Sequence, residues 1–265
     1  MGTFPLACHL IQWRGEQHEN PEKVFAEVAE AGWDGVEGAR CSTPEELVER
    51  ASQARSFGLH LVNAVCPDPI ARIGYNATLG NDAVDVPALR RRDWAGPDPG
   101  DDDIRRAATS LDGVLAECKR LRMKGFHHAH LGTLIETVED AERLLAAAPD
   151  LWLLYDTGHM LAAGSDPLRV FQLGLGPRIG HVHLKDFHAD DPTTWNHRQQ
   201  RINTTGRFAE LGQGNVGFEP RRALEALEKS GYQGWVSVEL DVPFPEKPPA
   251  EAARANREYL RGLGY

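Results

Sequence analysis

The stretch that decides the fold is residues 151–187, LWLLYDTGHMLAAGSDPLRVFQLGLGPRIGHVHLKDF. An apolar run at 151–155 ends in the sequence DTGH, and a second strand-like run that starts at 179 ends in KD at 185–186. Between them, Asp166 and Pro167 are residue types preferred at a helix N-cap and at the first helical position. Strand, helix and strand with polar residues at the carboxyl ends of the strands are typical of a parallel α/β fold, in which ligand and catalytic groups lie at those ends.

Alternation along the second strand predicts which of its side chains point inward. His181, His183 and Lys185 share one face, and Val182 and Leu184 share the other. In a barrel the apolar face packs against the outer helices, so the histidines and the lysine face the interior. Burying such groups is costly unless they bind something, and the strand therefore predicts a functional site.

The size and charge of the chain limit the classes of function. A length of 265 residues and a mass of 29.3 kDa fit a single domain, residues 1–265, of the α/β-barrel size. The net charge of −10 argues against a nucleic-acid partner, because phosphate contacts need clustered cations. The one dense basic run, Arg90-Arg91-Arg92, is followed by acidic residues within 98–103, and we expect it to be a solvated loop.

The sequence also gives expectations about location. No apolar run approaches the roughly 18 residues of a membrane span, and the first residues lack the basic segment of a secretory signal. The four cysteines (Cys8, Cys41, Cys66 and Cys118) form no CxxC pair, so we expect them to be reduced and buried. These features predict a cytoplasmic protein without a membrane partner. They leave the oligomeric state open, and a homo-oligomer is compatible with them.

Strand-like and helix-like segments alternate seven or eight times along the chain, which predicts a TIM (β/α)8-type barrel. Residues 66–103 fit this pattern poorly because they show no amphipathic helix. Residues 71–75 could form the fourth strand, but 66–70 is too short for the crossover between parallel neighbours. We therefore expect an irregular barrel, or one that lacks a helix between strands three and five. Residues 103–124 predict one helix, and 190–217 predict a polar loop long enough to act as a lid.

Four strands are expected to carry polar side chains at the carboxyl ends of their inward faces. The inward residues are Phe126, His128 and His130 on the fifth strand, Trp152, Leu154 and Asp156 on the sixth, His181, His183 and Lys185 on the seventh, and Trp235, Ser237 and Glu239 on the eighth. A slip of one residue within 127–130 would change which histidines face inward. Mixed imidazole and carboxylate groups predict one divalent metal ion. Mn²⁺ and Co²⁺ are favoured, Zn²⁺ is compatible, and Mg²⁺ is least favoured because it prefers oxygen ligands.

Five short motifs resemble the xylose-isomerase-like sugar phosphate isomerase/epimerase superfamily. They are DTGH at 156–159, HVHLKD at 181–186, GQGNV at 212–216, WVSVE at 235–239 and HAHLGT at 128–133, of which the last is most similar to the inosose dehydratase branch. The resemblance covers 111–242 well and 4–65 loosely. Each motif alone is weak, but their order and spacing together are specific.

The resemblance implies a metal held by four side chains, which fall on His128, Asp156, His183 and Glu239. Most members of the superfamily have glutamate at the position of His128. Isomerases and epimerases of the superfamily use two glutamates as an acid–base pair, and a metal-bound imidazole is a poor second base because coordination occupies its lone pair. Glu136, in the loop that follows the fifth strand, is a reserve ligand.

By the same resemblance we expect an elimination of water from a polyhydroxy ketone, with a sugar or cyclitol as the small-molecule substrate. The metal would polarise the ketone and stabilise the enolate, one base would remove the α-proton, and an acid would assist loss of hydroxide as water. Glu239 and Lys185 are the candidate bases, and His159 is the candidate acid or a substrate contact. Further candidate substrate contacts are Glu37, Trp13, His130 and Arg207.

Other functions stay open at this point. An aldose–ketose isomerase or epimerase on the same fold is disfavoured by His128, and a catalytically silent barrel that acts as a binding module is favoured by the irregular segment 66–103. A DNA-repair endonuclease on this fold would need a basic groove and further metal ligands. Residues 212–217 match G-x-G-x-x-G, but the segment before them is not a buried strand, so we expect these glycines to allow a close approach of the backbone to the site rather than to bind a dinucleotide.

Overall fold

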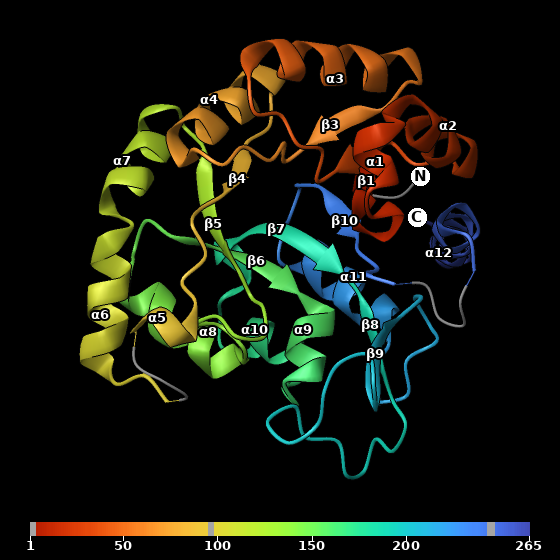
Figure 1. Ribbon diagram of the computed structural model, residues 1–265. Helices are drawn as coiled ribbons and strands as arrows, with labels where there is room; N and C mark the ends of the chain where they lie inside the picture. The colour runs from red at the N-terminus through yellow and green to blue at the C-terminus, as the bar shows by residue number, and fades with distance from the viewer. Residues whose placement is uncertain (1–3, 95–97, 243–246) are drawn as a thin grey trace.

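The computed structural model describes residues 4–94, 98–242 and 247–265. In this part of the chain, eight parallel strands form one sheet in the order β3-β2-β1-β10-β7-β6-β5-β4 (Figure 1). The strands are β1 (Leu6–His9), β2 (Gly35–Glu37), β3 (His60–Val62), β4 (Ala83–Asp85), β5 (Lys124–His128), β6 (Trp152–Asp156), β7 (Ile179–Leu184) and β10 (Val236–Val238). The alternation in the sequence therefore produces the predicted α/β barrel fold.

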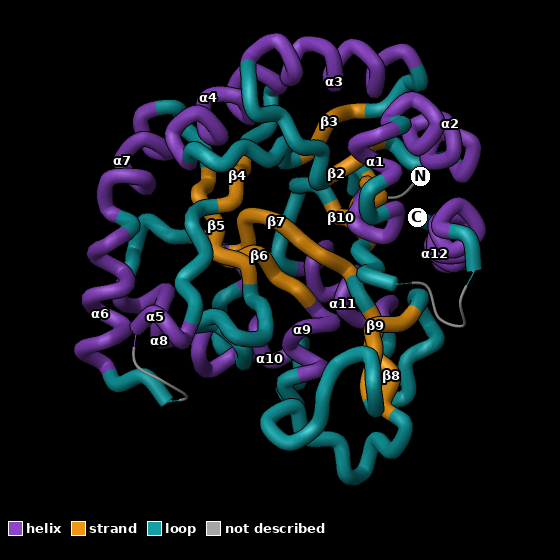
Figure 2. The backbone as a smooth tube through the Cα atoms, in the orientation of Figure 1, coloured by secondary structure: helices purple, strands orange, loops and turns teal. Residues whose placement is uncertain are grey.

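Helices surround the strands on the outside, as Figure 2 shows. They are α1 (Glu16–Glu19), α2 (Pro21–Ala31), α3 (Pro44–Ser56), α4 (Pro69–Leu79), α5 (Arg91–Trp94), α6 (Asp101–Ser110), α7 (Asp112–Arg120), α8 (Val138–Ala147), α9 (Thr157–Ala162), α10 (Arg169–Gln172), α11 (Pro220–Lys229) and α12 (Pro249–Leu263), with short 3-10 turns η1 (Leu10–Trp13) and η2 (Gly176–Arg178). In α2 the apolar residues Val24, Phe25 and Val28 are buried. In α2, spacing of apolar residues by three and four thus directs the helix onto the sheet.

The first and last strands pair with each other. Leu6 of β1 lies opposite Val236 of β10 in parallel register. Outside them, α12 packs against α2, and Arg257 Nε donates to the carbonyl of Gly32 at 2.8 Å. The first and last described segments of the chain therefore lie side by side in Figure 1.

The segment between β3 and β4 differs from the prediction. Residues 71–75 are not a strand but the middle of α4, so the barrel has a helix in this position. Asp68 caps α4 by accepting from the amide of Ala71 at 2.7 Å, and Pro69 stands at its first position. The buried residues of α4 are Ile73 and Asn76, and a polar residue on the inner face removes the apolar periodicity that would have revealed the helix.

Strands β3 and β4 lie at the two ends of the sheet, and their connection is unusual. No backbone ladder joins them in the described residues, and asparagine side chains bridge them instead. The amide of Asp85 donates to Asn63 Oδ1 at 3.3 Å, and Asn81 Nδ2 donates to the carbonyl of Leu61 at 3.1 Å. We call this contact between β3 and β4 the asparagine seam.

Asn76 of α4 completes the asparagine seam from the outside. It is fully buried, and its side chain pairs with both backbone groups of Ala64, accepting from the amide at 2.9 Å and donating to the carbonyl at 2.9 Å. Asn81 also donates to Asn76 Oδ1 at 2.9 Å. A polar residue is therefore retained on the inner face of α4 because it satisfies backbone groups that no neighbouring strand reaches.

Two further segments differ from their predicted structure. The helix expected over 103–124 is two helices, α6 and α7, which meet at the buried residue Leu111. The predicted loop 190–217 contains a strand, β9 (Gly206–Ala209), which pairs in antiparallel register with β8 (Asp186–Ala189). This hairpin projects from the carboxyl end of β7 (Figure 2). Trp195, in the loop that joins its strands, donates to the carbonyl of Ala162 at 2.8 Å.

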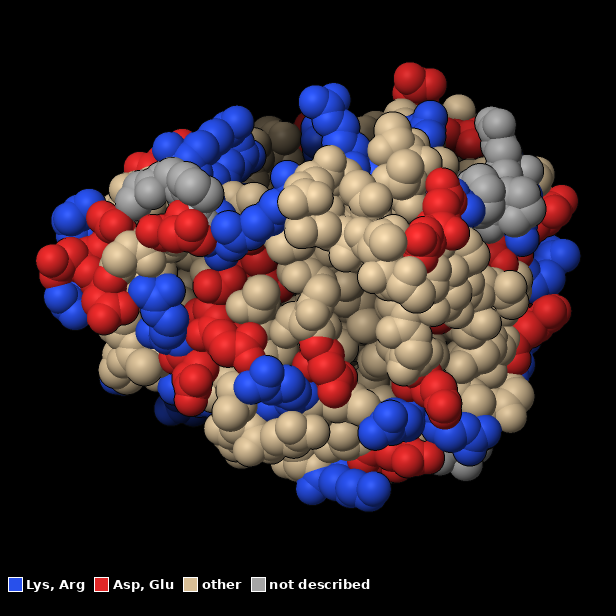
Figure 3. All heavy atoms as spheres, turned by 90° about the horizontal axis from the view of Figure 1, so that it is seen from below, with Lys and Arg blue, Asp and Glu red and all other residues tan. Residues whose placement is uncertain are grey.

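Other properties of the molecule agree with the sequence. The four cysteines are free and buried. Within the described residues, every helix is too short or too polar to cross a membrane. On the face shown in Figure 3, cationic and anionic side chains are interspersed around a broad uncharged area.

Candidate metal centre

Four side chains from neighbouring strands converge at the carboxyl end of the sheet. His128 ends β5, Asp156 ends β6, His183 lies on β7 and Glu239 directly follows β10. One ligand atom from each lies within 4.8 Å of those of the other three. These are the four residues that the sequence predicted, and we call them the metal cluster.

The register of β5 is the one that alternation predicts. His128 faces the interior, where its Nε2 lies 3.1 Å from Asp156 Oδ2. His127 faces the other way, and its Nε2 accepts a hydrogen bond from the amide of Leu89 at 3.0 Å. Glu136, the reserve ligand, lies outside the metal cluster and interacts with Arg91 at 3.2 Å.

His183 is the most crowded member of the metal cluster. Its Nδ1 lies 2.5 Å from Glu239 Oε2 and 3.5 Å from Asp156 Oδ2, and its Nε2 lies 3.1 Å from Glu37 Oε1. Burial alone would lower the pKa of His183, but the carboxylates of Glu239 and Glu37 raise it well above its usual value. In the absence of a metal, this imidazole is therefore a cation held between carboxylates.

Glu37 supports the histidines from behind. It is fully buried at the end of β2, and it accepts from His181 at 2.8 Å, from His183 at 3.1 Å and from Asn63 Nδ2 at 2.9 Å. Burial would raise its pKa, but the two imidazoles lower it well below the usual value. These occupied oxygens argue against the predicted role of Glu37 as a substrate contact. Its strand is too short for the sequence to have shown that it faces His181 and His183.

Lys185 is also fully buried. Its Nζ lies 3.2 Å from Glu239 Oε1, 3.3 Å from Asp241 Oδ2 and 3.7 Å from Asp156 Oδ2. Burial would lower its pKa, but these carboxylates raise it above the usual value, so the amine stays protonated. A protonated lysine has no lone pair to accept a proton, which argues against Lys185 as the base.

The donor set and its charges fit a divalent cation. Among the described residues of this region, Glu37, Asp156 and Glu239 are three buried carboxylates, whereas Lys185 and, in the absence of a metal, the protonated His183 are two buried cations. Buried carboxylates in excess of cations need a counterion. In addition, Glu239 Oε2 and His183 Nδ1 lie 2.5 Å apart, and both atoms are buried without a hydrogen-bond partner of regular geometry among the described residues. A metal ion in contact with both atoms would satisfy them.

His159 and His130 lie beside the metal cluster. The ring of His159, in the first turn of α9, is 5.6 Å from that of His128 and 3.7 Å from that of the exposed His130. Its Nδ1 lies 3.5 Å from the amide of Leu131, and its Nε2 is buried without a partner among the described residues. Burial and the charge of Lys185 lower the pKa of His159 well below its usual value, so this imidazole is neutral.

His9 is a residue of the site that the sequence analysis missed. It ends β1, and its ring lies 5.4 Å from that of His183. Its Nδ1 accepts from the amide of Ile11 at 3.2 Å, so the neutral ring carries its proton on Nε2 and offers a donor rather than a metal ligand. Gly38, at φ 88°, makes room for this ring, because a Cβ there would lie 2.8 Å from His9 Cε1. Alternation along β1 was the available signal, since His9 and Ala7 share the face of Ser237.

Two predicted substrate contacts lie elsewhere. Trp13 is buried in η1, where its Nε1 donates to Glu27 at 2.7 Å. Arg207 lies on β9, and its Nη1 contacts Asp190 at 3.0 Å. Neither belongs to the metal cluster or lines the cavity described next.

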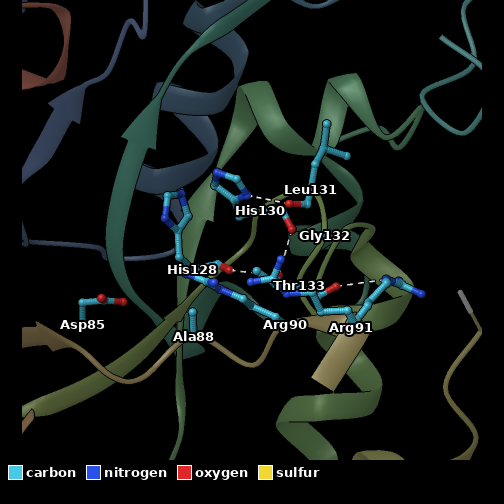
Figure 4. A pocket seen from close by; sticks show the side chains of 10 residues that line it. Asp85, Ala88, Arg90, Arg91, His128, His130, Leu131, Gly132 and Thr133 are labelled. Carbon is cyan, nitrogen blue, oxygen red and sulfur yellow. Dashed lines mark hydrogen bonds between the residues drawn. The ribbon is translucent and has the colours of Figure 1, made fainter. Parts of the chain in front are cut away.

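A cavity of about 680 Å³ opens beside the metal cluster, between the connections that follow β4 and β5 (Figure 4). His128 belongs both to the metal cluster and to the wall of the cavity. The lining residues are Asp85, Ala88, Arg90, Arg91, Arg92, His128, His130, Leu131, Gly132 and Thr133. The cavity therefore gives a ligand a path to one member of the metal cluster.

Comparison with known proteins gives the same fold. The family described as "Xylose isomerase-like TIM barrel" matches residues 25–263. An inosose dehydratase of Lacticaseibacillus casei is 33% identical over 165 residues, which are 60% of this chain and 54% of that protein, so the chain spans about half the length of the curated relatives it matches. A xylose isomerase domain protein from Alicyclobacillus acidocaldarius has a TM-score of 0.73 at 19% identity over 98% of both chains. A xylose isomerase-like TIM barrel protein from Mycobacterium smegmatis, solved in complex with magnesium, has a TM-score of 0.70 at 15% identity over 99% of this chain and 98% of its own.

Proposed function

Starting from the fact that the chain belongs to the xylose isomerase-like TIM barrel family, we propose that it is a metal-dependent lyase that eliminates water from a polyhydroxy ketone. The observation that carries this proposal is the position of His128 against Asp156 in the metal cluster. A metal-bound imidazole is a poor acid–base group, which leaves Glu239 as the carboxylate available for proton transfer. One such group suffices for an elimination, whereas an epimerase needs a second one on the opposite face of the substrate.

The proposed ion is Mn²⁺ or Co²⁺, held by His128, Asp156, His183 and Glu239. Two imidazoles with two carboxylates suit these ions better than Mg²⁺, and Zn²⁺ remains compatible. When bound, the ion polarises the substrate carbonyl and stabilises the negative charge that develops on its oxygen. The metal identity follows from elemental analysis of the purified protein.

Glu239 is the proposed base. Burial would raise its pKa, but Lys185 and His183 lower it well below the usual value, so the carboxylate is ionised and able to accept the α-proton of the ketone. Lys185 holds Glu239 Oε1 at 3.2 Å and thereby orients the carboxylate. Lys185 is a positioning residue, because a fully buried amine does not reach the substrate.

The proton that leaves with the hydroxyl group also comes from Glu239. The C–H electrons form the carbon–carbon double bond, the C–O bond breaks, and the protonated carboxyl returns its proton to the departing hydroxide, which leaves as water. His159 is neutral and is therefore a hydrogen-bond donor to a substrate oxygen rather than the acid. His9, with its proton fixed on Nε2, is a second donor beside His183.

Proton NMR in D₂O tests the proposal with a cyclic polyhydroxy ketone as the substrate. An enone product supports the lyase. Solvent deuterium in unchanged or epimerised sugar would instead support an isomerase or epimerase on the same fold.

Metal analysis tests the third alternative, a catalytically silent barrel. Less than about 0.2 equivalents of metal after growth with manganese and cobalt would favour it, because a four-ligand site normally retains its ion. The segment 66–103 no longer supports this alternative, since α4 is present.

A further inference from the structure

The cavity beside the metal cluster concentrates positive charge in an acidic protein. The chain has a net charge of −10, yet three consecutive arginines, Arg90 to Arg92, line the cavity together with His128 and His130. The sequence alone suggested that this run is a solvated loop paired with the acidic residues that follow. Arg90 and Arg92 are exposed, as expected, but the run also bridges to the connection after β5 and lines the cavity.

Two of the three arginines have other roles. Arg91 Nη2 lies 2.7 Å from Asp140, and Arg91 Nε lies 3.2 Å from Glu136 and donates to the carbonyl of Thr133 at 3.0 Å. This side chain fixes the loop and is not available to a ligand. The side chain of Arg92 is 73% exposed and lies 3.8 Å from Asp93, so solvent screens its charge.

Arg90 is exposed, as Arg92 is, but unlike both neighbours it has no acidic partner among the described residues. Its side chain has no hydrogen bond or ion pair with any residue that the structure describes, and in Figure 4 it extends along the cavity in the direction of His128. Its backbone is held firmly, because it bridges to Thr133 and because the next amide, that of Arg91, donates to the carbonyl of Gly132 at 2.9 Å. A guanidinium on a fixed backbone that points into a cavity is suited to bind a planar or tetrahedral oxyanion.

The one carboxylate in the cavity wall does not neutralise Arg90. Asp85 lies 2.9 Å from Nη1 of Arg72, which also donates to the Asp85 carbonyl at 3.3 Å. Asp85 is therefore already paired from behind the wall. The remaining charge of the cavity is positive.

We infer that the substrate carries an oxyanion, either a carboxylate or a phosphate, and that Arg90 binds it while the carbonyl end of the substrate lies at the metal cluster. The placement of the carbonyl end at the metal cluster rests on the proposed function, whereas the binding of the oxyanion by Arg90 does not. It separates this protein from enzymes whose substrate is a neutral inosose, because a neutral ring would leave Arg90 without a partner.

Isothermal titration calorimetry tests the inference with three probes that share a polyhydroxy six-membered ring. They are myo-inositol, which is neutral, quinate, which carries a carboxylate, and myo-inositol 1-phosphate. For the manganese-loaded protein, at least one of the two anions should bind about tenfold or more tightly than myo-inositol, since a charge-assisted bidentate contact contributes that much. The anion that binds more tightly identifies which oxyanion the substrate carries.

Variants assign the preference to Arg90. Arg90→Gln should remove the advantage of the anion and leave the affinity for myo-inositol unchanged, and Arg90→Lys should retain part of it because charge remains without the planar fork. Arg105→Gln is the matched control, because it removes the same charge from an exposed pair on α6 outside the cavity. If neither anion binds more tightly than myo-inositol, if no probe binds, or if Arg105→Gln has the effect of Arg90→Gln, the inference is wrong.

The same titrations with metal-free protein separate this inference from the proposed function. Arg90 is not a metal ligand, so the preference for an anion should persist without the ion. A protein that prefers anions but neither retains metal nor forms an enone would disprove the lyase and leave the oxyanion site. A protein that forms an enone from a neutral ketone without any anion preference would support the lyase and disprove the oxyanion site.

Discussion

Glu37 Oε1 lies 3.1 Å from His183 Nε2, on the side of the imidazole opposite the carboxylate of Glu239. A carboxylate in this position keeps the proton of a neutral imidazole on Nε2. It thereby leaves the lone pair of Nδ1 directed at the metal cluster. Glu37, which is not a member of the metal cluster, thus sets the orientation of His183.

Replacing Glu37 with glutamine should weaken metal binding by about 10- to 100-fold, the usual effect of removing a carboxylate behind a ligating histidine. Competition with a chelator of known affinity measures the change. Glu22→Gln, at an exposed position of α2, is the control. An unchanged metal affinity in Glu37→Gln, with its melting temperature also unchanged, would show that Glu37 does not orient His183.

Metal binding should release protons. The pKa of His183 in the metal-free protein is raised above its usual value of about 6.5 by Glu239 and Glu37, so this residue must lose a proton before Nδ1 can bind an ion. Metal affinity should therefore increase with pH through the range above 6.5. Calorimetry in buffers of different ionisation enthalpy measures the proton count, and a count of zero at neutral pH would contradict the assignment.

The same raised pKa affects the stability of the metal-free protein. A histidine with a higher pKa in the folded than in the unfolded state contributes stability that is fully present below the unfolded pKa. That contribution is lost as the pH rises through the folded pKa. Urea unfolding of the metal-free protein across this range should show the decline, and saturating metal should abolish it.

Glu239→Gln should lower the elimination rate by about 10²- to 10⁴-fold, because it removes the proposed base. Glu239 is also a proposed ligand, so the metal content of each preparation must be measured beside the rate. A variant that retains its metal and also its rate would exclude Glu239 as the base. Lys185 would not replace it, since its ammonium group lies 3.2 Å from the altered side chain and has no free lone pair.

Asn76→Ala should destabilise the fold by about 2–4 kcal/mol, because it leaves both the amide and the carbonyl of Ala64 buried without their partner. Urea unfolding of the metal-free protein measures the change. Thr78→Ala is the control on the exposed face of α4, and it should change stability by less than about 0.5 kcal/mol. Equal effects of the two substitutions would show that the asparagine seam contributes nothing beyond ordinary helix propensity.

The parts of the fold that could be predicted from the sequence are those with long, regular strands. In β6 and β7, alternation placed Asp156 and His183 on the inner face, and the structure brings them to 3.5 Å. The four members of the metal cluster were all found in this way, with the help of the motifs that resemble a known superfamily.

The parts that were missed depend on contacts that a linear pattern does not contain. The inner face of α4 carries Asn76, so the helix lacks apolar periodicity. Alternation along β1 places His9 on the inner face, but no linear pattern shows that His9 and Glu37, from two different short strands, meet the same imidazole. Arg90 looks like part of a surface run until the connection after β5 is placed beside it.

The role of the glycine-rich segment 212–217 could be predicted from the sequence only in part. A close approach of the backbone to the site was expected there, but the amides of Gly212 and Gly214 both donate to Asp186 Oδ2, at 3.0 and 3.1 Å, and Asp186 is not a member of the metal cluster. A Cβ at Gly214 would clash with Asp186 Oδ1 and lie 2.7 Å from the carbonyl of Phe187. The glycines therefore anchor the β8–β9 hairpin to the end of the barrel.

In the described residues, side-chain amides rather than a ladder of main-chain hydrogen bonds join β3 to β4. The barrel can therefore widen at this position without breaking main-chain hydrogen bonds between strands. This position adjoins Asp85, in the wall of the cavity. The four metal-cluster residues instead lie on or directly after β5, β6, β7 and β10, which are neighbours joined by backbone hydrogen bonds. Deuterium uptake by backbone amides should begin beside β3 and β4 and reach β6 and β7 last. The cavity can thus open and close at this position while the four residues of the metal cluster keep their relative positions.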